Sequence, residues 1–183
     1  MKVFHIAALL AFGAVCLAGQ ATAQSAQYGP AYVGAIEAVV DERRVPLERQ
    51  TAVISMKSKA FGMGGMEMRY EIKGAKSSIR LRHGQTFFFV SRFSQGSVDP
   101  QTMFALNVMK TNKKGRMIPQ MSVGGYFAVD PIKQKASEYR IALVFEPYKK
   151  DFVKITPATA LAPGEYFIQS VAGGLDGFAF GID

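Results

Sequence analysis

One stretch near the middle of the chain alternates strictly between apolar and charged side chains. Its apolar residues are Met66, Met68, Tyr70 and Ile72, and its charged residues are Glu67, Arg69, Glu71 and Lys73. Successive side chains of a β-strand point to opposite faces, whereas a helix needs a period near 3.6 residues. The stretch therefore predicts a strand over 66–73 with one apolar and one charged face.

The segment 86–93 follows a different pattern, because it is apolar on both faces. Phe87, Phe88, Phe89 and Val90 stand in succession. A strand with two apolar faces is covered on both sides, so this segment predicts a central strand.

Short stretches rich in Val, Ile, Phe and Tyr continue after residue 30, separated by clusters of Gly, Asn, Asp, Ser and Pro. This pattern is typical of many short strands. Further strands are predicted at 32–40, 51–58, 103–110, 126–129, 139–145, 152–155, 165–171 and 178–182. Connections such as 111–116 suit hairpins and long helical crossovers are missing, so the strands should pair mainly antiparallel. We expect one all-β domain over 31–183, an antiparallel β-sandwich of immunoglobulin-like character.

The N-terminus has the pattern of an export signal. Lys2 precedes an uncharged apolar run at 6–17, and Ala21-Thr22-Ala23 offers small side chains to a signal peptidase. The sequence predicts a signal peptide over 1–23, cleaved after Ala23, and a flexible lead over 24–30. The apolar run is short for a membrane anchor, so we expect an exported protein, periplasmic or secreted, without a transmembrane segment after cleavage.

Cysteine usage and charge narrow the chemistry further. The only cysteine, Cys16, lies in the predicted signal peptide, and Val15 before it does not suit a lipobox. The processed chain therefore has no disulfide, no cysteine nucleophile and no Cys-ligated zinc or iron–sulfur cluster. Removing Lys2 changes the net charge from +8 to +7 (21 minus 14). Such a basic exported domain favours an anionic envelope component or another protein as partner, and nucleic acid is not expected.

A turn near the C-terminus carries fold information. Pro163-Gly164 makes a tight turn, and Tyr166 opens a strand directly after it. In immunoglobulin-like sandwiches a tyrosine at such a corner points inward and bonds its hydroxyl to nearby backbone. We expect Tyr166 to take this structural role.

Three short segments resemble a recurring group of exported bacterial β-domain proteins that has no characterised function. They are 73–78 (KGAKSS), 161–166 (LAPGEY) and 178–183 (FAFGID). The resemblance implies an exported β-domain, and the group offers no catalytic or binding residue to carry over.

Enzyme signatures are scarce. After residue 23 the only histidine is His83, and no G-x-S-x-G, H-E-x-x-H, phosphate-binding or dinucleotide-binding motif is found. We expect no catalytic residues and no cofactor. A hydrolase built around His83 is the enzymatic alternative.

Methionines suggest one metal-binding alternative. Met63, Met66 and Met68, with Met56 and His83 nearby in the sequence, resemble the thioether sets that bind Cu(I) in exported copper-handling proteins. However, Met66 and Met68 lie on the same face of the predicted strand as Tyr70, and methionine commonly fills gaps in cores. We therefore expect core packing, with a periplasmic Cu(I)-binding protein as the alternative.

One basic cluster falls at a predicted hairpin tip, where it can meet an anionic surface without disturbing a core. It consists of Lys110, Lys113, Lys114 and Arg116.

Together these features favour a non-enzymatic exported domain with a binding or structural role in the bacterial envelope or extracellular space. A small outer-membrane β-barrel is a further alternative, although the chain ends in Asp183 rather than in an aromatic residue.

Overall fold

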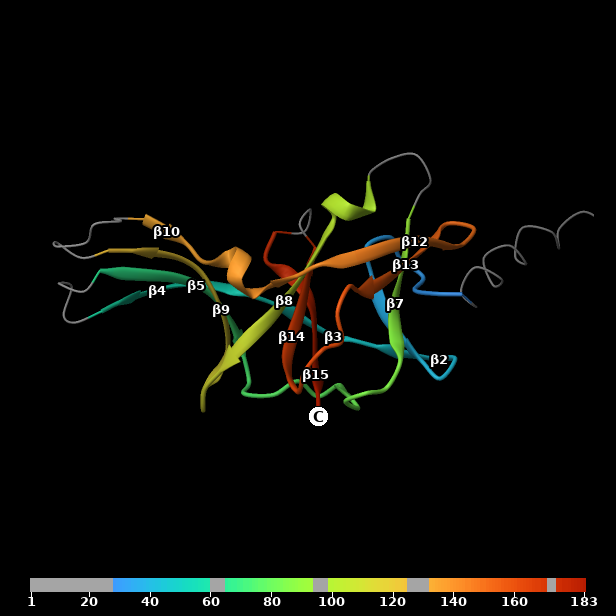
Figure 1. Cartoon of the computed structure of the whole chain (residues 1–183), viewed down its shortest axis with the longest axis horizontal. Coiled ribbons are helices and arrows are strands. Elements are labelled where there is room, and N and C mark those ends of the chain that lie inside the picture. The colour runs from blue at the N-terminus through green and yellow to red at the C-terminus, as the bar shows by residue number, and fades with distance from the viewer. Residues whose placement is uncertain (1–27, 60–64, 94–98, 125–131, 171–173) are drawn as a thin grey trace, which may run out of the picture.

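A computed structural model describes residues 28–59, 65–93, 99–124, 132–170 and 174–183 (Figure 1). These residues form strands, with two short 3₁₀ turns, η2 (Pro100–Thr102) and η3 (Ala136–Tyr139). The all-β prediction is confirmed. In the described part of the chain, no helix has the length and apolar character needed to cross a membrane.

The strands follow one another with short connections. They are β1 (Ile36–Val40), β2 (Arg43–Pro46), β3 (Glu48–Thr51), β4 (Val53–Ser58), β5 (Met66–Lys73), β6 (Arg80–Leu81), β7 (Phe87–Arg92), β8 (Phe104–Thr111), β9 (Gly115–Val123), β10 (Ile132–Gln134), β11 (Arg140–Ile141), β12 (Leu143–Lys149), β13 (Phe152–Pro157), β14 (Gly164–Ser170) and β15 (Asp176–Ile182). The predicted strand at 66–73 is β5, with the bounds expected. The segment 126–129 lies outside the described residues.

Two sheets form, and they curl into a half-barrel. The smaller sheet has the order β12-β13-β7-β1-β2, so β7 lies at its centre, as its two apolar faces predict. The larger sheet follows the order β3-β15-β14-β8-β9-β5-β4, with β10, β11 and β6 attached to β9, β8 and β15. Among the described residues the named strands pair antiparallel except β6 and β15, and one isolated bridge, between Val33 and Arg92, is also parallel. The immunoglobulin-like arrangement stays a prediction.

The main core lies between the two sheets. Ile36, Phe89 and Ile155 of the smaller sheet pack with Leu106 and Phe180 of the larger one, and all are buried. Apolar side chains of two facing sheets are thereby removed from water together, which drives their association.

A second core forms because the β8–β9 hairpin divides the larger sheet. The two strands pair only at Lys110–Met117 and Thr111–Arg116, next to the turn. Beyond this point β8 continues beside β14, and β9 continues beside β5. The second core consists of Ala52, Ile72, Met109, Ile118, Phe167 and Ala179. It joins the base of β4, β5 and β9 to the β14–β15 region.

The outer parts of β4, β5, β9 and β10 extend away from this second core as an arm, on the left of Figure 1. One face of the arm continues the apolar face that enters the second core at Ile72 and Ile118. The architecture thus leaves part of a sheet outside both cores.

Candidate functional site

A buried group of charged side chains lies beside the second core. Arg116 on β9 is only 1% exposed. Its guanidinium lies 3.5 Å from Glu165 Oε2 and 3.5 Å from Glu48 Oε1, and its Nη2 donates to the carbonyl oxygen of Lys73 at 2.9 Å. Buried charges need such partners, because an isolated ion in a low-dielectric interior is very costly.

The same group joins the segments 73–78, 161–166 and 178–183. Ser77, from 73–78, donates its backbone N–H to Glu165 Oε2, from 161–166, at 2.8 Å. Arg80 forms ion pairs with Glu165 and with Asp183, which ends 178–183. One ion cluster therefore links the three segments, and Glu165 contacts Ser77, Arg80 and Arg116 in it.

Hydrogen bonding controls the ionisation of this cluster. Burial acts to raise the pKa of Glu48, but hydrogen bonds from Ser77, Ser78 and Gln50 and the charge of Arg116 outweigh it and lower this pKa below its ordinary value. Hydrogen bonds from Arg80 likewise lower the pKa of Asp183. Both carboxyl groups are held ionised, which fits a structural role.

The prediction that Arg116 belongs to an exposed basic tip is wrong. Strand parity places Arg116 on the same face of β9 as Ile118, toward the second core, where Glu48 and Glu165 compensate its charge. Neither carboxylate is near Arg116 in the sequence, so the local pattern of lysines could not indicate its burial.

The three lysines of the predicted loop are exposed. Asn112 shapes the tip, because its side-chain oxygen accepts hydrogen bonds from the backbone N–H groups of Lys114 and Gly115. Lys113 and Lys114 flank this turn, and the Lys110 ammonium lies 5.1 Å from the centre of the Tyr139 ring. Binding of an anionic partner by Lys110, Lys113 and Lys114 stays a prediction.

A cleft of about 430 Å³ lies beside this tip. Its lining includes Arg69, Lys73 and Lys114, with Glu71 as the acidic member. Glu71 forms an ion pair with Arg69. Sequence reasoning missed Arg69 and Lys73 because only the β5–β9 pairing brings them to the hairpin.

The Tyr166 prediction is confirmed. Its side chain is buried, stacks on Phe180 with ring centres 5.3 Å apart, and donates its hydroxyl to the carbonyl oxygen of Ala162 at 2.6 Å. Burial raises the pKa of the phenol. The tyrosine closes the Pro163-Gly164 turn from inside.

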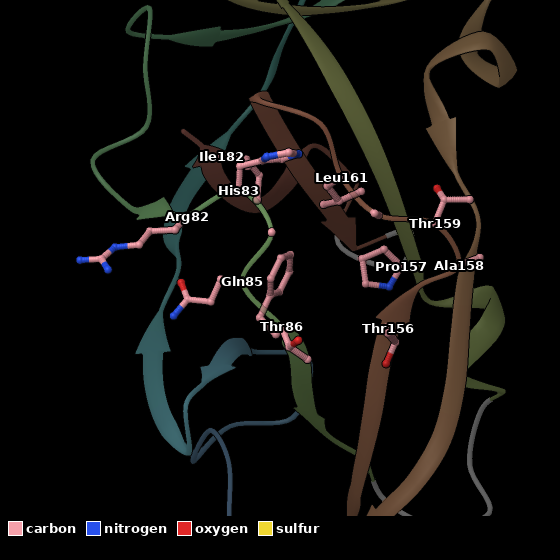
Figure 2. A pocket seen from close by; sticks show the side chains of 13 residues that line it. Arg82, His83, Gln85, Thr86, Thr156, Pro157, Ala158, Thr159, Leu161 and Ile182 are labelled. Atoms are coloured by element: carbon pink, nitrogen blue, oxygen red, sulfur yellow. The ribbon is translucent and has the colours of Figure 1, made fainter.

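His83 borders a pocket of about 320 Å³ between the β6–β7 connection and the segment after β13 (Figure 2). Thr86, Thr156 and Leu161 line it, whereas the Arg82 side chain extends away from it in Figure 2. The described residues that line the pocket include no Asp or Glu. His83 itself is exposed. The pocket thus offers hydroxyl and amide contacts, without a carboxylate to pair with the imidazole.

The structure does not assemble the metal set considered from the sequence. Met63 lies outside the described residues. Met66 and Met68 lie on β5 in the arm. His83 lies beside β15, several strands away in the larger sheet, where its backbone N–H donates to the carbonyl oxygen of Asp183. Over the described ranges, no group of three or more His, Asp, Glu or Cys is placed to hold a metal ion.

The expectation that Met66 and Met68 pack in a core is wrong for Met66, which is 45% exposed. Cross-strand partners share a face of a sheet, and the register extends the face of Met66 over four strands. We call this surface the methionine face; it consists of Ile54, Met56, Met66, Met68, Met121, Val123 and Ile132. Met56 is 66% exposed and Ile132 61%. Exposed apolar groups gathered on one face mark an interaction site more often than scattered ones do.

The methionine face ends at an open sheet edge. Strand β4 pairs with β5 on one side, and among the described residues no strand pairs with its other side. The backbone N–H of Lys59 donates to the carbonyl oxygen of Gly65 at 2.8 Å, so these two opposed residues form a hydrogen-bonded pair. The Lys57–Glu67 pair, two residues further along β4, is of the same type. Hydrogen-bonded and non-hydrogen-bonded pairs alternate in an antiparallel ladder. The N–H and C=O groups of Ile54 and Met56 therefore point to the open edge.

Comparisons of this chain with protein-family models, with curated proteins and with solved structures give no match.

Proposed function

We propose that this chain is an exported, non-enzymatic binding domain whose sandwich, of immunoglobulin-like character, presents the open edge of β4 to an extended segment of another protein. The segment adds to the sheet as a further antiparallel strand. Recognition of this kind combines main-chain hydrogen bonds with contacts of alternate side chains.

The observation that carries the proposal is the combination of free backbone groups and exposed apolar side chains on β4. Ile54 and Met56 direct backbone groups outward, and their side chains are 51% and 66% exposed. Exposed apolar edges are sites where another chain pairs, and natural proteins usually protect them with proline, charge or short length.

The other sheet edges carry such protection. The smaller sheet ends in β2 and β12, which contain Pro46 and Pro147. The larger sheet's other end is β3, a strand of only four residues that includes two charged ones, and β10 spans only Ile132–Gln134. Proline removes a ladder donor and is compatible with a strand only at edges or bulges. Strand β4 contains no proline, and Lys57 is its only charged residue. The difference between β4 and the other edges supports β4 as the pairing edge.

The two faces of β4 specify the chemistry of the partner. On one face Ile54 and Met56 form the border of the methionine face at the open edge, and on the other face Lys57 is exposed. An added strand with apolar residues on one face and acidic residues on the other matches both the apolar face of β4 and the positive charge of Lys57. The anionic partner favoured by the net charge is thereby narrowed to an extended acidic-apolar protein segment.

Peptide binding tests the proposal. A fluorescein-labelled octapeptide VEVTVEVT is titrated with the protein, beside the non-alternating peptide VVVVEETT, and anisotropy is measured. We expect tighter binding of the alternating peptide and a loss of about tenfold or more in affinity for Ile54→Lys and Met56→Lys. Val144→Lys is the matched control, because Val144 is an exposed apolar residue (46%) on the other sheet. No binding of the alternating peptide, or equal losses in all three variants, overturns the proposal.

A further inference from the structure

Three methionines stand side by side across the arm. Met56 on β4 is the direct partner of Met68 on β5, and Met68 is the direct partner of Met121 on β9. They are far apart in the sequence, so only the strand register brings them into one row.

The geometry of the row allows their sulfurs to converge. Met56–Met68 is a non-hydrogen-bonded pair, the type in which side chains approach most closely. Cβ atoms of directly opposed residues lie about 4.5–5.5 Å apart. Methionine has three rotatable side-chain bonds, so the outer thioethers can lean over the central Met68 and the three can surround one ion.

The surroundings of the row favour a soft cation of low charge. On the same face the next row is Ser58, Met66, Val123 and Ile132. The row on the other side includes Ile54 and Tyr70. Within these described rows the face carries no charged side chain. Gln134 ends the methionine row and its amide lies 4.0 Å from Met121 Sδ. Thioethers are soft ligands that select Cu(I), whereas hard cations need oxygen ligands.

We propose that Met56, Met68 and Met121 form a binding site for a soft monovalent metal ion, Cu(I). This site differs from the set suggested by sequence proximity, since it includes Met121 and does not include Met63, Met66 or His83. Metal binding at this site goes beyond the proposed strand addition, because it requires the thioether sulfurs, whereas strand addition requires backbone groups and apolar surface.

The test uses Ag(I), a soft monovalent ion that does not change oxidation state under these conditions, in chloride-free buffer. The full chain carries Cys16→Ser, so that no thiol competes. The protein is labelled with ¹³C at the methionine methyl groups and titrated by NMR. We expect the signals of Met56, Met68 and Met121 to shift together and to saturate at one equivalent.

Leucine variants separate the metal site from peptide binding. Met68→Leu keeps an apolar side chain of similar size, so it should abolish the saturable Ag(I) binding and leave VEVTVEVT binding unchanged. Met117→Leu is the control, because Met117 points to the opposite face of β9, where its sulfur accepts a hydrogen bond from Arg69 at 3.5 Å. Unchanged Ag(I) binding in Met68→Leu, or non-saturating shifts of all methionines alike, overturns the metal site. Met56→Lys removes one of the three thioethers, so it should abolish Ag(I) binding as well as weaken peptide binding. Intact Ag(I) binding in Met56→Lys would also overturn the metal site.

Discussion

Arg116 of β9 and Glu165 of β14 lie 3.5 Å apart in the buried region beside the second core, although they belong to strands that do not pair with each other. The pair bridges the base of the arm to the β14–β15 region. It therefore holds the arm, and with it the methionine face and the open edge of β4, in a fixed relation to the rest of the domain.

Loss of the arginine should destabilise the fold strongly. Arg116→Leu leaves Glu165 and Glu48 with fewer compensating partners, and breaking a buried ion pair costs about 3–5 kcal/mol. The free energy of unfolding from urea denaturation measures this cost. Lys114→Leu, two positions away on the exposed tip, should change it by less than about 0.5 kcal/mol. Similar values for both variants would mean that the Arg116 cluster contributes little.

The stability of the protein should fall in mild acid partly through Glu48. Its pKa in the folded protein lies below the ordinary value of 4.5, so its contribution is present above that pH. The contribution is lost as the pH falls through the lower pKa of the folded state. Glu48→Gln should therefore reduce the pH dependence of the urea midpoint between about pH 5 and pH 3. An unchanged slope in this variant would rule out Glu48 as a source of the acid sensitivity.

The Tyr166 hydroxyl should contribute a small, measurable part of the stability. Tyr166→Phe removes the hydrogen bond to Ala162 O and leaves the ring stack on Phe180 in place. The expected loss is about 1 kcal/mol, typical of one hydrogen bond, and thermal or urea unfolding measures it. Tyr32→Phe on the exposed N-terminal segment should have no effect. Equal stability of wild type and Tyr166→Phe would contradict a structural role for this hydroxyl.

The Arg80 guanidinium lies against the backbone of β15 at Gly181. A Cβ atom on residue 181 would overlap the Arg80 guanidinium. Gly181→Ala should therefore cost about 1–3 kcal/mol, because the guanidinium must move away from Glu165 and Asp183 to make room. The cost should shrink in an Arg80→Ala background, as a double-mutant cycle of urea denaturation would show. Additive effects would indicate that the two positions are independent.

Much of the strand pattern could be predicted from the sequence, because side-chain alternation is local. The bounds of β5, the central place of β7 and the inward turn of Tyr166 all follow from residues close together in the chain. Alternation shows which side chains share a face, but not what covers that face. Alternation therefore places Met66 on the correct face, but the prediction that it packs in a core is wrong.

Long-range pairing accounts for the other differences. The hairpin tip at Asn112 was predicted, whereas the burial of Arg116 depends on Glu48 and Glu165 from other strands. The row of Met56, Met68 and Met121 depends on the register of three strands. Neither grouping leaves a local signal in the sequence.

Hydrogen exchange at the open edge of β4 tests the proposed binding mode most directly. The backbone amides of Ile54 and Met56 point outward, so in the unbound protein they should exchange much faster than those of Ser55 and Lys57, which face β5. With the octapeptide VEVTVEVT bound, the amides of Ile54 and Met56 should become protected, because an added strand accepts their hydrogen bonds. Bound peptide that leaves these two amides unprotected would contradict strand addition at β4.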